Sequence, residues 1–337
     1  MTASGILPDH RLKTLFETGV IVAETPPADG QIQPASVDLR LGAQAWRLRA
    51  SFLPGRGRTV TQCLDSDIRM HTVDLTGGAV LETGCVYLAP LQERLKLPPG
   101  LTAAMNPKSS TGRIDVFTRV ITDSGEAFDR APPEYDGPLY AEISPCTFSI
   151  LAREGDRLSQ VRFREGAHVP LRDITVSVDL AGFEDGIVGY RARRHAGLVD
   201  LSRIGGHDRS RFWEPLFAPD HRLILDPGEF YILASREAVS IGPGEAAEMA
   251  PIATEIGEFR AHYAGFFDPG FGIAEAGGTG SRAVLEVRGR DVPFILEHGQ
   301  PIARLVYEPM REAPENAYGK IASNYQAQSL KLSKFFA

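Results

Sequence analysis

The sequence has few cysteines, and this scarcity argues against two common kinds of site. Among 337 residues there are three, Cys63, Cys85 and Cys146, which stand far apart and are odd in number. A disulfide framework or a cysteine-based zinc site is typically built from pairs at regular spacing, and no Cys-x-x-Cys sequence occurs. We therefore expect free thiols, a reducing compartment and no structural zinc.

Long apolar runs and a basic excess are lacking as well. No stretch approaches the roughly 18 apolar residues of a membrane span, and the first ten residues lack the basic and apolar pattern of a signal peptide. A net charge of -7 argues against a general nucleic-acid or anionic-membrane binder. We predict a cytoplasmic protein that binds neither nucleic acid nor membranes. An anionic small molecule stays open as a ligand.

Glycine and proline are abundant, and they separate short apolar runs. The 34 glycines and 24 prolines punctuate segments such as "CVYLAP" and "DVFTRVI", which we predict to be strands. One helix is predicted near the start, where Leu12, Leu15 and Phe16 share a face and Gly19 follows as a stop signal. The chain is expected to be all-β with a short N-terminal helix.

An internal repeat divides the chain, because four segments recur with one common offset of 144 residues. This register favours duplication of a whole domain over a solenoid. We predict a first domain at 1–165, a connector at 166–222 and a second domain at 223–337. The matched pairs are "LETGCVYLAP" (81–90) with "LDPGEFYILA" (225–234), "PPGLTAAMNP" (98–107) with "GPGEAAEMAP" (242–251), "LYAEI" (139–143) with "AVLEV" (283–287), and "GDRLSQVRF" (155–163) with "GQPIARLVY" (299–307).

The segment "PKSSTGR" (107–113) has the composition of an anion-binding bend. Backbone amides beside serine and glycine, flanked by a lysine and an arginine, suit a phosphate or an oxyanion. Taken alone, such a short motif is more often an ordinary surface turn. In the second copy Ser109 is replaced by Ala253 and Arg113 by Gly257, so the bend exists only once.

The neighbouring segments, in their order and rough spacing, resemble the dCTP deaminase and dUTPase family. In the first half they are "QPASVDLRLG" (33–42), "PKSSTGR" (107–113), "YDGPLYAEI" (135–143) and "GDRLSQVRF" (155–163). In the second half "YAGFFDPGFG" (263–272), "QPIARLVYEP" (300–309) and "AYGKIASNYQAQ" (317–328) are similar to the pyrimidine hairpin and C-terminal tail of that family. The chain thus resembles the long, duplicated bacterial form of dCTP deaminase.

The resemblance implies two tandem dUTPase-like domains of the β-clip, or distorted jelly-roll, kind. It also implies a homotrimer in which the serine-arginine bend of one subunit meets the hairpin and glutamate of its neighbour. It also implies hydrolysis of dCTP to dUTP and ammonia by a water that a glutamate activates, without a catalytic metal. The His-x-Glu and Pro-Cys-x-x-Cys pattern of zinc-dependent deaminases is absent, which fits this implication. Mg²⁺ is expected only as the companion of the triphosphate.

Three residues match the family's catalytic positions. Glu142 matches the catalytic glutamate, Ser109 the serine that holds the attacking water or the amine, and Arg113 the arginine that stabilises charge. A buried strand position would raise the pKa of the Glu142 carboxyl and suit it to proton transfer. The remaining nucleotide contacts predicted in the first domain are Lys108, Ser110, Thr111, Gly112, Val120, Thr122, Asp123, Asp129, Tyr140 and Ala141.

Two arrangements of the site stay open. The bend can act with Glu142 if first domains assemble together, which we favour because both segments are intact. Alternatively the bend faces the hairpin of a second domain, with Glu286 and Asp268. The matching positions in the C-terminal tail are Tyr318, Lys320, Tyr325 and Gln328.

Two other functions stay open too. A dUTPase, or a bifunctional enzyme that continues to dUMP and pyrophosphate, needs an aspartate base, and Asp123, Asp129 or Asp268 could serve. A non-catalytic dNTP sensor is the other alternative. The joint presence of Ser109, Arg113 and Glu142 argues against the sensor.

Overall fold

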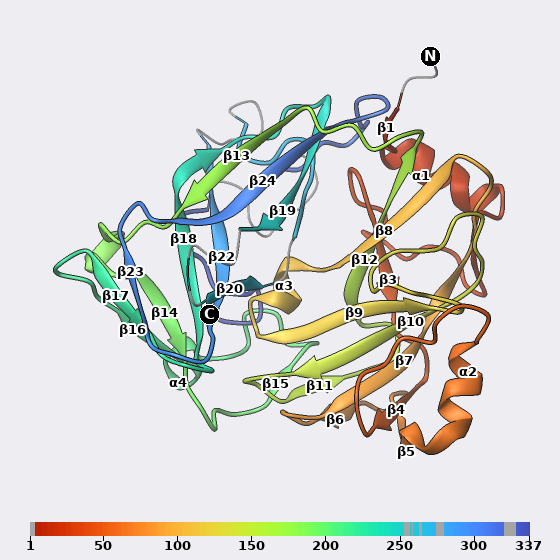
Figure 1. Cartoon of the computed structure of the whole chain (residues 1–337), viewed down its shortest axis with the longest axis horizontal. Helices are drawn as coiled ribbons and strands as arrows, with labels where there is room; N and C mark the ends of the chain where they lie inside the picture. Colours follow the sequence, from red (N-terminus) through yellow and green to blue (C-terminus); the bar gives the residue numbers. More distant parts are fainter. Residues whose placement is uncertain (1–3, 253–256, 258, 263–264, 274–279, 320–327) are drawn as a thin grey trace.

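A computed structural model describes residues 4–252, 257, 259–262, 265–273, 280–319 and 328–337. Two β-rich units lie side by side, the first built from the N-terminal half and the second from the C-terminal half (Figure 1). The mainly β architecture that the sequence predicts is confirmed. The helical segments are α1 (Asp9–Glu17), α2 (Val60–Cys63), η1 (Leu64–Ile68), α3 (Ser109–Gly112), η2 (Glu184–Gly186) and α4 (Arg209–Phe212).

Helix α1 forms where the apolar spacing places it. Leu12 is fully buried, and Leu15 and Phe16 pack against the core of the first unit. The helix stops before Gly19, which has a φ of 71° in the left-handed region that glycine adopts without strain. Across the described residues, no helix combines the length and the apolar character needed to cross a bilayer.

Three sheets make up the first unit, and neighbours in each are hydrogen-bonded. The first sheet contains β1 (Gly5–Ile6), β12 (Arg157–Glu165), β3 (Val37–Arg40) and β8 (Leu101–Pro107). The second contains β5 (Arg69–Asp74), β4 (Gln44–Leu48), β7 (Val86–Lys96), β10 (Asp136–Pro145), β9 (Val116–Thr122) and β2 (Ile21–Ala23). The third contains β15 (Val199–Asp200), β11 (Ile150–Ala152) and β6 (Ala79–Leu81).

The sheets of the second unit follow the same plan. One contains β13 (Arg172–Ser177), β24 (Pro301–Pro309), β19 (Glu245–Pro251) and β21 (Phe266–Phe267). Another contains β16 (Trp213–Leu216), β14 (Gly189–Ala192), β18 (Phe230–Val239), β22 (Ser281–Gly289) and β20 (Phe259–His262). A two-stranded sheet pairs β17 (Arg222–Leu225) with β23 (Phe294–Glu297).

The sequence repeat is also a repeat of strand register. Glu142 of β10 pairs with Leu88 of β7, and 144 residues later Glu286 of β22 pairs with Ile232 of β18. Because side chains alternate across a strand, this shared register gives the two glutamates equivalent positions in their sheets.

Residues 166–222, which the sequence predicts as a connector, extend this repeat. Trp46 of β4 pairs with Leu88, and Tyr190 of β14 pairs with Ile232 at the same offset. β13 joins β24, and β16 joins β14. Most of this segment therefore begins the second unit, because strands of that unit satisfy its backbone hydrogen bonds. Its short strand β15 instead pairs with β11 of the first unit.

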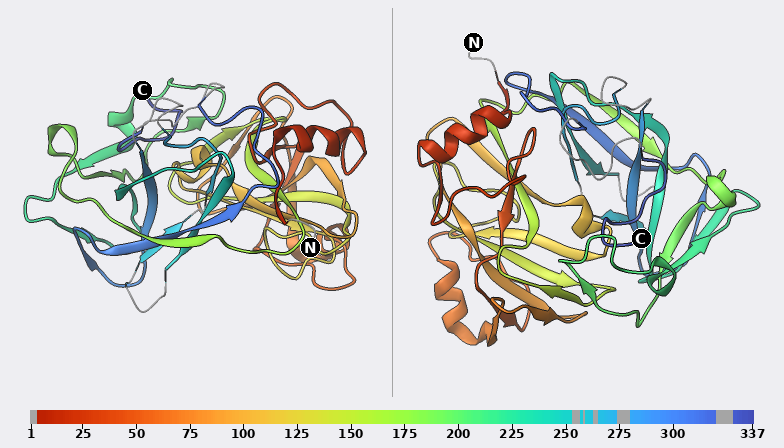
Figure 2. Two further views of the ribbon diagram at one scale, coloured as in Figure 1. Left: turned by 90° about the horizontal axis from the view of Figure 1, so that it is seen from above. Right: turned by 180° about the vertical axis from the view of Figure 1, so that it is seen from behind.

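The end of the chain returns to the boundary between the units. Leu332 and Phe335 belong to the hydrophobic core of the first unit. The Phe336 ring lies 6.3 Å from Phe148 of that unit and 5.3 Å from Phe212, measured between ring centres. The C-terminus is accordingly seen between the two units in Figure 1 and in the right-hand view of Figure 2. These aromatic contacts fix the last residues beside α3.

Candidate active site

The bend predicted at residues 107–113 is a single helical turn that follows β8. Lys108 is extended, and its carbonyl accepts the amides of Thr111 and Gly112 at 2.9 and 3.0 Å. The Thr111 hydroxyl donates to the Leu158 carbonyl at 3.0 Å, so it holds the turn against β12. Ser109 is partly exposed, whereas Arg113 is buried. The turn is therefore a rigid element with one hydroxyl presented outward.

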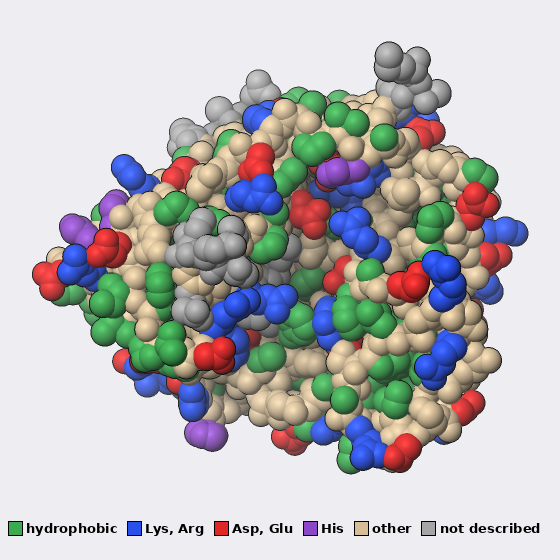
Figure 3. Space-filling view, in the orientation of Figure 1, with side chains coloured by type: hydrophobic (Ala, Val, Ile, Leu, Met, Phe, Trp, Pro, Cys, Tyr) green, Lys and Arg blue, Asp and Glu red, His purple; other side chains and the backbone are tan. Residues whose placement is uncertain are grey.

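A cavity of about 620 Å³ lies between the units, and the bend forms one of its walls. This volume lies in the range of small-molecule sites, roughly 300–1,000 Å³. Figure 3 shows basic side chains around the hollow between the two units. The first unit contributes Lys108, Ser109, Ser110, Arg113, Asp38 and Arg157, and the second contributes Phe266, Phe267, Asp268, Phe271, Glu286, Tyr318, Gln328 and Lys334.

Glu286 is the glutamate that lines this cavity. It is 6% exposed, and burial raises the pKa of its carboxyl well above the usual value. The positive charge of Arg113 opposes that rise, while the nearby Asp115 adds to it. A buried carboxyl with a raised pKa beside a fixed cation is the kind of group that accepts and returns protons near neutral pH.

Strand β22 contacts the segment of the first unit that follows the bend. Arg288, two residues after Glu286 and thus on the same face of the strand, forms an ion pair with Asp115 of the first unit. Its Nη2 also donates to the Thr147 hydroxyl at 3.2 Å. These contacts hold the face of β22 that carries Glu286 against the segment that carries Arg113.

Glu142, the glutamate that the sequence favours, lies outside this cavity. Its Oε1 accepts the Arg119 Nε–H at 3.1 Å, and Arg119 lies directly opposite on β9. The guanidinium of Arg119 also stacks at 3.5 Å from the centre of the Phe128 ring and donates to Ser51 Oγ at 2.8 Å. Glu142 is therefore engaged in an ion pair within its own unit.

The segment between β4 and β5 covers the same part of the first unit. It contains α2 and η1, and Val60 and Leu64 from it pack against Ile121 and Tyr140. The Val60 amide donates to Asp123 Oδ1 at 2.7 Å. The place that corresponds to the cavity beside Glu286 is thus filled by the chain itself.

The residues predicted for base recognition in the first domain surround Glu142 and do not line the cavity. Val120, Thr122 and Ala141 are buried in strands of the first unit. Asp129 Oδ1 accepts the Val120 amide at 2.7 Å, and burial raises the pKa of Asp129 to about 7. Asp123 and Tyr140 are likewise not among the residues that line the cavity with the bend.

The predicted contributions of the second domain are found in the cavity where they are described. Gln328 Oε1 accepts Arg113 Nη1–H at 3.1 Å, and the same nitrogen donates to the Lys331 carbonyl at 2.9 Å. Tyr318 packs on Phe271, and Asp268 lines the wall opposite the bend. Lys320 and Tyr325 lie outside the described residues.

Two cations in the cavity were missed by the sequence interpretation. Lys334 is a lysine of the C-terminal end, and burial, together with the charges of Lys108 and Arg157, lowers its pKa. Arg157 Nη1 lies 3.8 Å from Asp38 Oδ2, and Lys108 also pairs with this carboxylate. Arg157 stands in the family-like segment 155–163, which offered a signal, whereas Lys334 lies beyond every matched segment.

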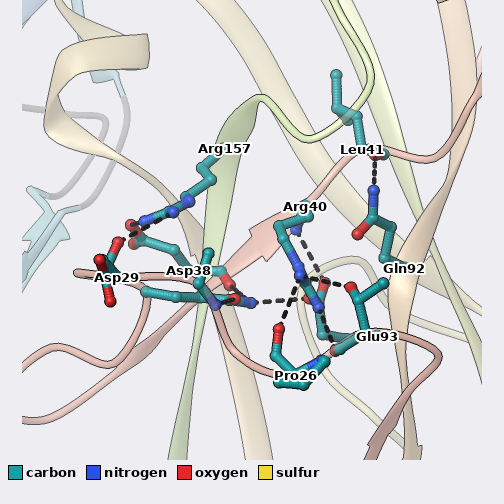
Figure 4. A network of polar contacts seen from close by, with 11 residues as sticks. Pro26, Asp29, Asp38, Arg40, Leu41, Gln92, Glu93 and Arg157 are labelled. Atoms are coloured by element: carbon teal, nitrogen blue, oxygen red, sulfur yellow. Dashed lines mark hydrogen bonds and ion pairs between the residues drawn. The ribbon is translucent and has the colours of Figure 1, made fainter. Parts of the chain in front are cut away.

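Asp38 forms its ion pairs with Lys108 and Arg157, because Arg40 on the same strand is already paired with Glu93. Figure 4 shows Asp38 and Arg157 pointing toward one another, with Arg40 bound to Glu93 nearby. Arg40 Nε donates to the fully buried Glu93 at 2.6 Å. Lys108, Arg157 and Lys334 thus bring three positive groups to the end of the cavity that holds Asp38 and Asp156.

Within the described parts of the chain, no three His, Cys, Asp or Glu side chains are placed to hold a metal ion.

Family models match almost the whole chain. The model for the N-terminal domain of 2'-deoxycytidine 5'-triphosphate deaminase matches residues 3–167, and the model for its C-terminal domain matches residues 153–336. The chain belongs to the dCTP deaminase family. This membership confirms the resemblance seen in the sequence and identifies the chain as an enzyme that deaminates dCTP.

A solved structure and curated relatives agree with this membership. The crystal structure of 2'-deoxycytidine 5'-triphosphate deaminase from Agrobacterium tumefaciens is 54% identical, with a TM-score of 0.88, over 92% of this chain and 100% of that one. A dCTP deaminase from Haloarcula marismortui is 30% identical over 48% of this chain and 80% of its own length. A dCTP deaminase described as dUMP-forming, from Methanosphaera stadtmanae, is 29% identical over 47% and 78% respectively.

Proposed function

We propose that the chain deaminates dCTP to dUTP and ammonia in the cavity between its two units, with Glu286 as the proton-transfer group. One observation carries this proposal: the serine-arginine bend of the first unit faces the buried glutamate of the second unit. The second of the two arrangements considered from the sequence is thereby favoured over the first. Glu142 is left with a structural role in its pair with Arg119.

Glu286 supports both proton transfers of the reaction. As the carboxylate it takes a proton from water while the water oxygen bonds to C4 of the cytosine ring, and it passes this proton to N3 as the C4–N3 double bond becomes a single bond. The resulting tetrahedral carbon carries both a hydroxyl and the amino group. Glu286 then takes the proton of that hydroxyl and gives it to the amino group, the bond between C4 and the amino nitrogen breaks, and ammonia leaves as the C4 carbonyl forms. A pKa raised well above the usual carboxyl value suits one group to both steps.

Arg113 and Ser109 assist at opposite sides of the reacting carbon. Arg113 is held by Gln328 and the Lys331 carbonyl, so its charge is already in place before substrate binds. A fixed charge of this kind stabilises the transition state without reorganisation. Ser109 presents its hydroxyl into the cavity, where it orients the attacking water or the departing amine.

The triphosphate is proposed to lie at the basic end of the cavity. Lys108, Arg157 and Lys334 supply positive charge there, and the bend offers the backbone amide of Ser110. Mg²⁺ arrives with dCTP as part of the substrate and supplies further charge neutralisation of the phosphates. These groups bind and orient the triphosphate, and the proton transfers are carried out by Glu286.

The product is the second part of the proposal. We favour dUTP, and a bifunctional reaction that continues to dUMP is the alternative, because several curated relatives are described as dUMP-forming. Asp268 lines the cavity and is the aspartate placed to act as a base in that second reaction. The other two aspartates considered from the sequence, Asp123 and Asp129, do not line it.

Product analysis tests the proposal. Purified protein is incubated with dCTP and Mg²⁺, and dUTP, dUMP, pyrophosphate and ammonia are quantified. We expect dUTP and ammonia in equal amounts, and neither product from Glu286→Gln. Accumulating dUMP would establish the bifunctional reaction instead. No ammonia from the wild-type protein, or undiminished release from Glu286→Gln, would refute the proposed site.

The assembly is proposed on the family resemblance, and the location on the few scattered cysteines. A homotrimer, or a multiple of it, is expected in solution, and light scattering after size-exclusion chromatography measures its mass. Because the bend and Glu286 belong to one chain, the proposed site does not depend on a second copy. The cytoplasm is the proposed location, which fractionation of the native cells tests.

A further inference from the structure

Arg162 lies in β12 of the first unit, yet most of its contacts are with the second unit. Its side chain is 2% exposed. Nη1 donates to the Ala247 carbonyl at 3.0 Å, and Nη2 donates to the Phe267 carbonyl at 3.3 Å and to Asp268 Oδ1 at 3.0 Å. The guanidinium carbon lies 4.1 Å from the centre of the Phe266 ring. One side chain thus binds four residues of the other unit.

These contacts converge on one wall of the cavity. Phe266, Phe267 and Asp268 all line it, opposite the bend. Strand β21, which consists of the two phenylalanines, is joined to β19 through two residue pairs. Two residue pairs fix the position of such a short strand only weakly. A planar guanidinium has donors in a fixed fork, so it can hold two carbonyls and a carboxylate in one geometry.

The strand itself does not require an arginine at this position. The corresponding residue of the second copy is Val306, which lies in the equivalent strand β24. Burying an arginine–carboxylate pair gives little net stability, because removing both charges from water offsets most of their attraction. The contacts of Arg162 are not needed for a stable strand, and they are concentrated on one wall of the cavity. They therefore indicate that Arg162 fixes the position of that wall.

We propose that Arg162 is a positioning residue for the deamination reaction, fixing Asp268 and β21 so that the Asp268 carboxylate meets a hydrogen-bond donor of the bound nucleotide. This inference rests on the proposed site between the units. Arg162 does not line the cavity and acts through Asp268. The arginine comes from the unit that carries the bend, so it sets the distance between the two halves of the site.

Arg164 provides a matched control on the same strand. It lies two residues further along on the same face and also bridges the units, with Nε donating to Glu308 Oε2 at 2.8 Å. Neither Arg164 nor Glu308 lines the cavity. Arg164→Met therefore removes a comparable buried contact between the units and leaves the contacts of β21 in place.

Steady-state kinetics with Mg²⁺ and dCTP, together with melting temperatures, separate positioning from simple adhesion of the units. We expect Arg162→Met to raise the KM for dCTP about tenfold or more relative to Arg164→Met. A loss of folded protein lowers kcat and leaves KM unchanged. Arg162→Lys, which keeps the charge but not the fork, should restore part of the KM.

A double variant tests whether Arg162 acts through Asp268. If it does, Arg162→Met combined with Asp268→Asn loses no more kcat/KM than the more damaged single variant. Multiplicative losses, or equal KM values for Arg162→Met and Arg164→Met, would overturn the inference. If Arg162→Met does not fold, Arg162→Lys takes its place in the cycle. Absence of ammonia from the wild-type protein would instead refute the proposed function.

Discussion

Glu142 and Glu286 occupy the same position in the two copies of one fold, but their surroundings differ. Glu142 lies opposite Arg119 on β9, and that arginine neutralises it. Glu286 lies opposite His262 on β20, and its raised pKa reflects a buried site facing the bend of the other unit. The comparison shows that register conserves the position of a carboxyl, whereas neighbouring elements decide its chemistry.

The two copies have kept different halves of a site. The first copy has the serine-arginine bend, and its own hairpin region is closed by α2, η1 and Arg119. The second copy has Glu286 and the Asp268 wall, and its sequence carries no serine-arginine bend. Duplication makes this division possible, because one complete site needs one bend and one glutamate.

Replacing each of the two glutamates in turn is the strongest test of this comparison. We expect Glu286→Gln to lower kcat by about 10²–10⁴-fold, since proton transfer is lost. Glu142→Gln should leave kcat close to wild type and lower the melting temperature, because Arg119 loses its charged partner. Ammonia release measures the first effect and thermal unfolding the second. Activity lost in Glu142→Gln alone would return the site to the first unit.

The two arginines beside these glutamates sharpen the same contrast. Arg113→Met is expected to lower kcat/KM by about 10²-fold, as for removal of one preorganised charge or donor in an active site. Arg119→Met should cost about 3 kcal/mol in the free energy of unfolding, because it leaves the buried Glu142 without its partner. Urea unfolding and kinetics on both proteins give the comparison. An inactive but fully stable Arg119→Met would contradict it.

Lys334 tests whether the end of the chain belongs to the site. We expect Lys334→Ala to raise the KM for dCTP about tenfold, in line with loss of one charge-assisted contact to phosphate. The difference in KM between wild type and variant should shrink at high salt, since screening weakens the attraction between Lys334 and the phosphate. Lys13→Ala, a change at a half-exposed lysine of α1, is the control. Equal KM values for the two variants would place the triphosphate elsewhere.

Asp129 of the first unit offers the smallest effect, and one of stability alone. Burial raises its pKa to about 7, so the folded protein keeps a proton that the unfolded chain loses above its ordinary pKa near 4. Stability from this group is therefore greatest at low pH and falls as the pH rises from about 4 to 7. Asp129→Asn should flatten this fall and be more stable than the wild-type protein at pH 8.

Asparagine is a suitable replacement because it preserves the local geometry. Its side-chain oxygen can still accept the Val120 amide, and it tolerates the φ of 61° at this position. Denaturant unfolding at several pH values gives the slopes. A slope that is unchanged in Asp129→Asn would show that other carboxyls carry the dependence.

Much of the fold was readable because it is local. Alternation of apolar residues marks the strands, Gly19 marks the end of α1, and the constant offset of 144 residues marks the duplication. The boundary of the second unit was less readable. Its first strands, β13 and β14, lie in a polar stretch that is assigned only by pairing with β24 and β18.

The sequence identified the separate parts of the site but not which of the two glutamates meets the bend. Ser109, Arg113, Glu286, Asp268, Tyr318 and Gln328 all line the cavity, and each was marked by a segment that resembles the family. Glu142 was marked equally well, yet it lies elsewhere. Nothing in its strand shows that Arg119 pairs with it or that the segment between β4 and β5 covers it.

By itself the sequence determined the all-β class, the duplication, the family and the residue types proposed for the deamination site. These follow from periodicity, offset and short segments, which are properties of the chain read in order. Only the tertiary structure decided which glutamate meets the bend and which cations gather beside it. That choice depends on contacts between residues more than a hundred positions apart, and the two copies carry the same glutamate in the same register.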